Sequence, residues 1–83
     1  MTYKFNNFTF VHGGKEHLAS GEAVYTLIDG FEDDQEASFD DVSLFEVTSP
    51  YGFVRKEHLP DFKDSVLTSL NRNENLTRSL ALR

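Results

Sequence analysis

Residues 23–28 read Ala-Val-Tyr-Thr-Leu-Ile, and this run is the clearest strand pattern in the chain. β-Branched and aromatic side chains dominate it, which is the composition that a pleated sheet favours. Asp29-Gly30 follows directly, and this dipeptide is typical of a tight turn. We therefore expect a strand at Ala23–Ile28 that lies centrally in an antiparallel sheet.

Upstream of this run, Tyr3–Phe5 and Phe8–Val11 alternate apolar and polar residues, which is strand periodicity. The apolar positions switch from odd to even numbers across Asn6-Asn7, so the chain needs a β-bulge or a tight turn there. The paired glycines within His12–Lys15 predict a further turn, because glycine adopts positive φ without strain.

Downstream, the charged segment Phe31–Glu36 is expected to be a loop, and a strand is expected to resume at Val42 and run through Val47. Ser49–Gly52 predicts another turn, after which Phe53–Arg55 is expected to return as a short strand. These assignments predict an antiparallel meander of three to four strands.

The remainder of the chain predicts helix. Pro60 suits a first helical position, because its missing N–H costs nothing there. At 100° per residue, one apolar stripe is formed by Phe62, Val66, Leu67, Leu70, Leu76, Leu80 and Ala81. Asn71 followed by Glu74 fits a capping-box variant that would open a second helix. We favour two helices over one continuous helix.

The 83 residues are expected to form one domain over residues 1–83, since domains usually contain about 50 to 250 residues. The expected fold class is α+β: a small antiparallel β-meander of three to four strands, followed by one or two C-terminal helices packed on one face. Eight Phe and three Tyr provide much of the apolar volume for the core.

The chain has no cysteine, which excludes disulfides and thiolate zinc sites and favours a reducing compartment. No segment reaches the roughly 20 apolar residues that span a bilayer. The N-terminus also lacks the apolar run of a signal peptide. We therefore expect a cytoplasmic protein that has no membrane partner.

Charge is distributed unevenly along the chain, whose net charge is −6. No Lys or Arg lies between Glu16 and Val54, whereas seven acids lie between Asp29 and Asp41. Direct binding to nucleic acid is not expected, because neutralising phosphates requires clustered Lys and Arg.

The acidic segment is the candidate partner-binding surface, and its expected partner is another protein with a basic surface. Its acids could imitate the phosphates of one nucleic-acid strand, and the alternative is a solvated loop that aids solubility. Phe31 and Phe39 either anchor an interface or belong to the core. The candidate residues are Asp29, Phe31, Glu32, Asp33, Asp34, Glu36, Phe39, Asp40 and Asp41.

Catalytic and metal-binding patterns fail on their spacing, so we predict a non-enzyme with no cofactor and no metal site. His12 and His17 are separated by one residue too many for the inverted zinc-hydrolase pattern, and two glycines intervene. Gly13-Gly14-Lys15 lacks the earlier glycine and the following Ser or Thr of a phosphate loop.

Three hypotheses for function follow. Small size, acidity and the lack of motifs are typical of phage and mobile-element accessory proteins, including anti-CRISPR and other anti-defence inhibitors, so the first is an inhibitor or adaptor. The second is an antitoxin-like or regulatory module that binds a partner, or forms a homodimer, through its C-terminal helices. The third is an enzyme or metal protein that uses His12, His17 and His58.

Overall fold

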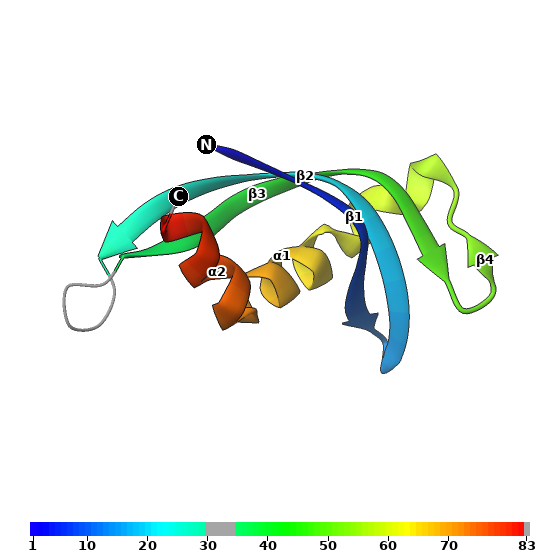
Figure 1. Ribbon diagram of the computed structural model, residues 1–83. Coiled ribbons are helices and arrows are strands. Elements are labelled where there is room, and N and C mark those ends of the chain that lie inside the picture. The colour runs from blue at the N-terminus through cyan, green and yellow to red at the C-terminus, as the bar shows by residue number, and fades with distance from the viewer. Residues whose placement is uncertain (30–34, 83) are drawn as a thin grey trace.

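Four antiparallel strands form one sheet in the computed structural model, which describes residues 1–29 and 35–82. The sheet order equals the chain order, so each strand pairs with the next one (Figure 1). The meander is therefore confirmed. The strands are β1 (Thr2–His12), β2 (Lys15–Asp29), β3 (Gln35–Ser49) and β4 (Gly52–Phe53).

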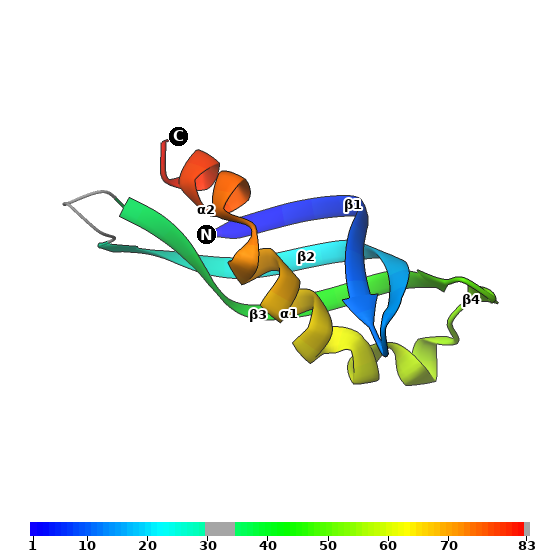
Figure 2. The same ribbon diagram turned by 90° about the horizontal axis from the view of Figure 1, so that it is seen from below.

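Three helical segments follow the sheet: a 3₁₀ segment η2 (Lys56–Phe62), α1 (Lys63–Arg72) and α2 (Glu74–Ala81). The sheet is curved, and the helices lie on its concave side (Figure 2). The α1 helix packs against β1 and β3, and α2 packs against β3. These observations confirm the α+β class, with the C-terminal helices on one face.

Several predicted boundaries were wrong. The central strand is much longer than Ala23–Ile28, and it lies between β1 and β3 as expected. The predicted loop includes Gln35 and Glu36, which instead pair with Asp29 and Ile28 as the first residues of β3. Strong cross-strand pairing along β2 thus extends the sheet into a segment that its charge alone marks as loop.

Helix starts also differ from the prediction. Pro60 lies inside η2, and the α-helix begins at Lys63. The cap of α2 is Asn73, whose side chain accepts a hydrogen bond from the backbone N–H of Leu76 at 3.2 Å. The predicted cap, Asn71, lies near the end of α1 and makes a different contact, with the edge of the sheet.

The irregularities that the sequence predicts for the first hairpin are present in the structure. The register shifts between Phe5 and Phe8, and Asn7 has φ of 52°, so of the bulge or tight turn expected there the structure has the bulge. Gly13 and Gly14 have φ of 60° and 77°, which confirms the predicted glycine turn. Two further bulges lie in β3, where Asp40 and Phe45 have no directly opposite residue in β2.

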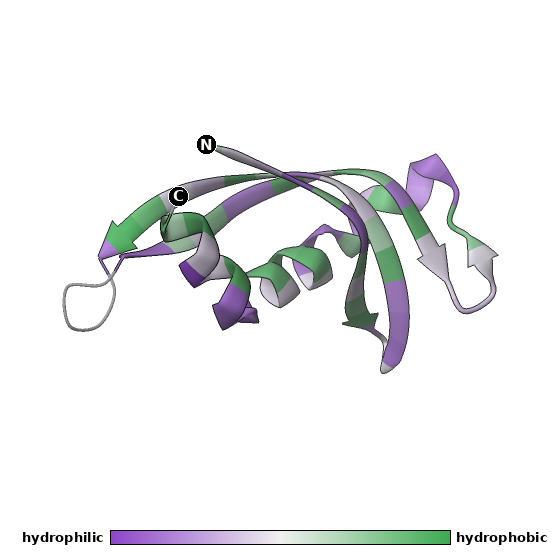
Figure 3. Ribbon diagram, in the orientation of Figure 1, coloured by the Kyte–Doolittle hydropathy of each residue, from purple (hydrophilic) through white to green (hydrophobic). Residues whose placement is uncertain are grey.

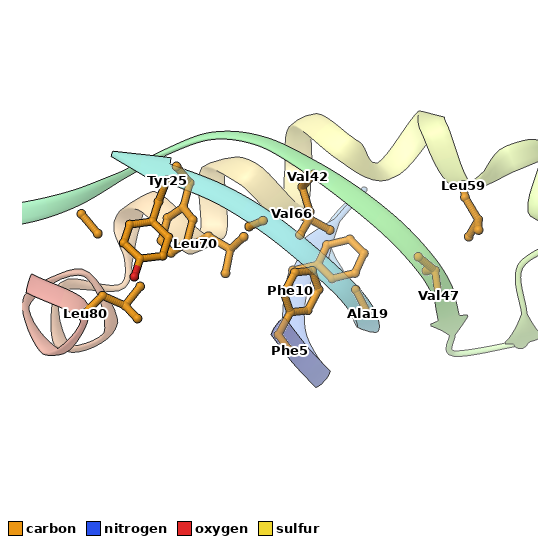
Figure 4. Close-up of a cluster of buried hydrophobic side chains, with 13 residues drawn as sticks. Phe5, Phe10, Ala19, Tyr25, Val42, Val47, Leu59, Val66, Leu70 and Leu80 are labelled. Carbon is orange, nitrogen blue, oxygen red and sulfur yellow. The ribbon is translucent and has the colours of Figure 1, made fainter. Parts of the chain in front are cut away.

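The core fills the space between the concave face of the sheet and the helices (Figure 4). Every second residue of β2 contributes to it, and Figure 3 shows the corresponding alternation of apolar and polar residues along the strands. The predicted stripe is confirmed, with Val66, Leu70 and Leu80 buried. The other buried hydrophobic residues are Phe5, Phe10, Ala19, Ala23, Tyr25, Ala37, Phe39, Val42, Val47 and Leu59.

In the described part of the chain, no helix is both long enough and apolar enough to span a membrane.

Candidate protein-binding surfaces

The acidic segment is only partly within the described residues. Phe31, Glu32, Asp33 and Asp34 lie outside them. Asp29, Asp40 and Asp41 are exposed. These three acids extend from the end of β2 into the middle of β3, so the candidate acids within the described residues are spread along two strands.

Basic side chains from the helices reach two of these acids. Arg78 of α2 lies 4.0 Å from Glu36, and Lys63 of α1 lies 3.4 Å from Asp41. A hydrogen bond from the backbone of Val42, and then the positive charge of Lys63, hold the pKa of Asp41 below its ordinary value. These ion pairs could not be predicted from the sequence, because the basic partners lie more than twenty residues further along the chain.

Asp40 has a partner as well. It lies at a bulge of β3 and accepts a hydrogen bond from the Thr26 hydroxyl of β2 at 2.8 Å. A carboxylate that is already bonded within the sheet is a weaker candidate for partner binding than a carboxylate with no internal contact.

Phe39 is a core residue. Its side chain is 3% exposed, and its ring lies 5.8 Å from that of Tyr25 and 6.1 Å from that of Tyr3, measured between ring centroids. Of the two interpretations that the sequence left open for this ring, the structure has the core one. Truncating Phe39 would therefore affect stability first.

Two of the three histidines lie together, with the His12 and His17 ring centroids 5.7 Å apart. The His12 and His17 rings pack against Phe62, with centroids 4.6 and 5.5 Å from it. His12 Nδ1 lies 2.8 Å from the Ser65 hydroxyl, and His17 Nδ1 donates to the Lys15 carbonyl. His58 is exposed on η2. Within residues 1–29 and 35–82, no three metal-ligating side chains come together.

The two leucines of α2 that belong to the predicted apolar stripe offer little free surface for dimerisation. Leu80 is 4% exposed and belongs to the core, and Leu76 is half-buried against it. A dimer through these two leucines would require α2 to leave the sheet, so this arrangement does not favour the second hypothesis.

A surface that the sequence analysis overlooked lies at the β3–β4 end. Tyr51 is 81% exposed, Phe53 is 76% exposed and Phe45 is 59% exposed. We call Ser49–Phe53 the aromatic turn. The available sequence signal was the place of Tyr51 in the predicted Ser49–Gly52 turn, because turns run over the surface of a protein.

The aromatic turn is held in place by its own polar groups. The Ser49 hydroxyl donates to the Gly52 carbonyl at 2.9 Å and accepts from the Tyr51 backbone N–H at 3.1 Å. Lys15 Nζ lies 4.5 Å from the centre of the Tyr51 ring and also contacts its hydroxyl. These bonds fix the ring before any partner arrives, which reduces the entropy lost on binding.

A groove lies next to this end, between β3 and η2. It has a volume of about 490 Å³. We call it the edge groove. Apolar side chains form most of its walls, and two lysines stand among them. Its lining residues are Ser43, Leu44, Phe45, Lys56, Leu59, Pro60 and Lys63.

Comparison with known proteins adds no functional assignment: no family model matches the chain, no curated protein matches its sequence, and no solved structure matches its fold.

Proposed function

We propose that this protein is a small protein-binding module, an inhibitor or adaptor that docks on another protein. The exposure of Phe45, Tyr51 and Phe53 at one end of the molecule supports this proposal. Aromatic side chains are enriched in interfaces, whereas a free protein gains nothing by keeping such rings in water.

The energetics require a contact larger than the aromatic turn alone. Burying Tyr51 and Phe53 would contribute roughly 3–6 kcal/mol, at about 1.5–3 kcal/mol for each ring. Association costs about 4–15 kcal/mol in lost freedom of motion. Neighbouring surface must therefore take part, and the rings act as anchors within it.

The acidic segment supplies a second, electrostatic element of the proposal. Asp29 is exposed at the end of β2 and has no ion-pair partner among the described residues. With net charge −6, the protein would approach a basic partner quickly. Such a partner could be a nucleic-acid-binding protein of a bacterial host, as for a phage-encoded anti-CRISPR or other anti-defence inhibitor that works in the cytoplasm.

The test begins with affinity capture and mass spectrometry to identify a partner, followed by titration of the purified partner. The double variant Tyr51→Ser/Phe53→Ser is expected to bind at least about tenfold more weakly, as interface anchors do. Its melting temperature should stay close to that of the wild type, because both rings are exposed.

The matched control is Val24→Ser, which removes an apolar side chain that is 49% exposed on the convex face of the sheet. It should leave affinity unchanged. If the double variant binds the captured partner as tightly as the wild type, the aromatic turn is not the contact surface, and the proposal in this form is wrong.

A further inference from the structure

We propose that the edge groove binds an extended, acidic segment of a partner protein by adding it as a strand beside β3. This inference rests on the proposed protein-binding function and specifies the chemistry of the partner. It is carried by three features of the groove: an unpaired strand edge, an apolar lining and two lysines.

The outer edge of β3 is bonded at two points. The side-chain amide of Asn71 pairs with both backbone groups of Phe39, at 2.8 and 3.1 Å. Further along, the Val54 N–H donates to the Val47 carbonyl at 2.9 Å. Between these points, the described residues provide no strand pairing on that side of β3, and the one bond there runs from the Val42 N–H to the neighbouring Asp41 carboxylate. An unpaired edge is a template for an incoming strand.

The length of this free edge limits the guest. Bulges at Asp40 and Phe45 interrupt the pairing of β3 with β2, and they leave a regular stretch at Asp41–Leu44. Four residues span about 13 Å at roughly 3.4 Å per residue. The groove volume of about 490 Å³ also lies within the range of roughly 300–1,000 Å³ that is typical of ligand sites. The site therefore suits a short peptide segment.

The apolar lining follows from the second bulge. Phe45 has no opposite residue in β2, and it lines the groove while remaining 59% exposed. Bulges re-aim side chains in this way near functional sites. Leu59 and Pro60 of η2 form the facing wall, so alternate side chains of a guest strand would meet apolar surface.

The charges of the groove select an acidic guest. Lys63 is already paired with the Asp41 carboxylate at 3.4 Å, so it is not the free charge of the groove. Lys56 lines the same groove and has no carboxylate partner among the described residues. A carboxylate of the guest would neutralise Lys56.

The test uses a short synthetic peptide of alternating valine and glutamate, titrated into ¹⁵N-labelled full-length protein at low salt. The expected result is a shift of the amide signals of Ser43–Phe45, Lys56 and Lys63. Lys56→Glu should weaken binding about fivefold, since an exposed charge pair is worth up to about 1 kcal/mol. Arg72→Glu, an equal charge change outside the groove, should leave binding unchanged.

Two further peptides separate the elements of the proposal. A valine–lysine peptide should not bind, and neither should a valine–glutamate peptide with alternate backbone nitrogens methylated. Binding of the methylated peptide at equal affinity would contradict strand addition. Shifts confined to the aromatic turn, or no shifts at all, would show that the groove is not the site.

A second copy of this chain is the competing occupant. In that case, dilution of the protein alone would shift the signals of Ser43–Phe45, and this result would overturn the proposal. The peptide assay needs no natural partner. If the peptide does not bind but Tyr51→Ser/Phe53→Ser still loses the captured partner, only the groove inference fails. If the peptide binds but Tyr51→Ser/Phe53→Ser keeps its full affinity for the captured partner, only the proposed contact surface is wrong.

Discussion

Gly21 permits the close approach of β2 and β3 beside the edge groove. A Cβ atom at this position would lie 2.1 Å from the Ser43 carbonyl oxygen and 3.1 Å from the Leu44 Cα atom. Both neighbours are backbone atoms, which cannot rotate away as a flexible side chain would. The bulge at Phe45 lies directly after this contact, so the missing side chain of Gly21 and the exposed ring of Phe45 are parts of one local arrangement.

We predict that Gly21→Ala lowers the free energy of unfolding by roughly 1–3 kcal/mol, the usual cost of overpacking. Urea unfolding measures this change, with an unchanged slope if both end states keep their compactness. The control Ser43→Ala changes an exposed side chain near the same contact and should stay within about 0.5 kcal/mol of the wild type. If Gly21→Ala has wild-type stability, β2 and β3 can move apart at this position at no cost in the free energy of folding.

At the scale of elements, Asn71 links α1 to the edge of the sheet. Its amide oxygen accepts from the Phe39 N–H, and its amide nitrogen donates to the Phe39 carbonyl. An asparagine side chain thus replaces one residue of a neighbouring strand. This contact also protects part of an edge that could otherwise pair with another chain.

Asn71→Asp is expected to destabilise the protein by about 1–3 kcal/mol, because the new carboxylate cannot donate and would face the Phe39 carbonyl. Amide exchange should report faster opening at Phe39 than in the wild type. Asn75→Asp makes the same chemical change in α2, at a side chain with no hydrogen bond to the sheet among the described residues, and should have little effect. Equal exchange at Phe39 in both variants would show that the Asn71 contact contributes nothing.

Local patterns predicted the order of the strands and helices, and tertiary contacts determined where each one begins and ends. The sequence predicted an irregularity at Asn6-Asn7 because apolar side chains must face one side of the sheet. It did not predict the start of β2, since the inward positions Ala19 and Gly21 are small and give a weak apolar signal. The partners of the acids and the role of Asn71 depend on segments that are distant in the chain.

At the scale of the whole molecule, chemically different groups lie at different ends. The principal extents are 43 × 23 × 17 Å, so the protein is elongated along its long strands. Asp29 and Glu36 lie where β2 ends and β3 begins, whereas the aromatic turn lies at the other end of β3, beside β4 (Figure 1). A partner that contacted both regions would have to extend along the length of the sheet.

The strand order also has a kinetic consequence. Each strand pairs with its neighbour in sequence, so the sheet closes through short hairpin loops, and hairpins form in about 1–10 μs. The helices must then dock across the finished concave face. We expect the sheet to form early in folding and α1 to dock late.

Val42→Ala in β3 and Val66→Ala in α1 test this order, because both side chains are almost fully buried and lose the same two methyl groups. Val42→Ala should mainly slow refolding, whereas Val66→Ala should mainly accelerate unfolding. Stopped-flow refolding in urea measures both rates. If Val66→Ala slows refolding as much as Val42→Ala does, the helix docks before or together with sheet closure.

During synthesis, the strands are made before the helices that cover them. Once the ribosome has completed β3, the segment from Pro50 through Ala81 still takes roughly 2–6 s to make, at about 5–20 residues per second. The β1–β2 hairpin can form within this interval, but the helices that cover Phe5 and Phe10 do not yet exist. The nascent hairpin therefore keeps an apolar surface in water for seconds, and in this interval it is exposed to aggregation or to capture by a chaperone.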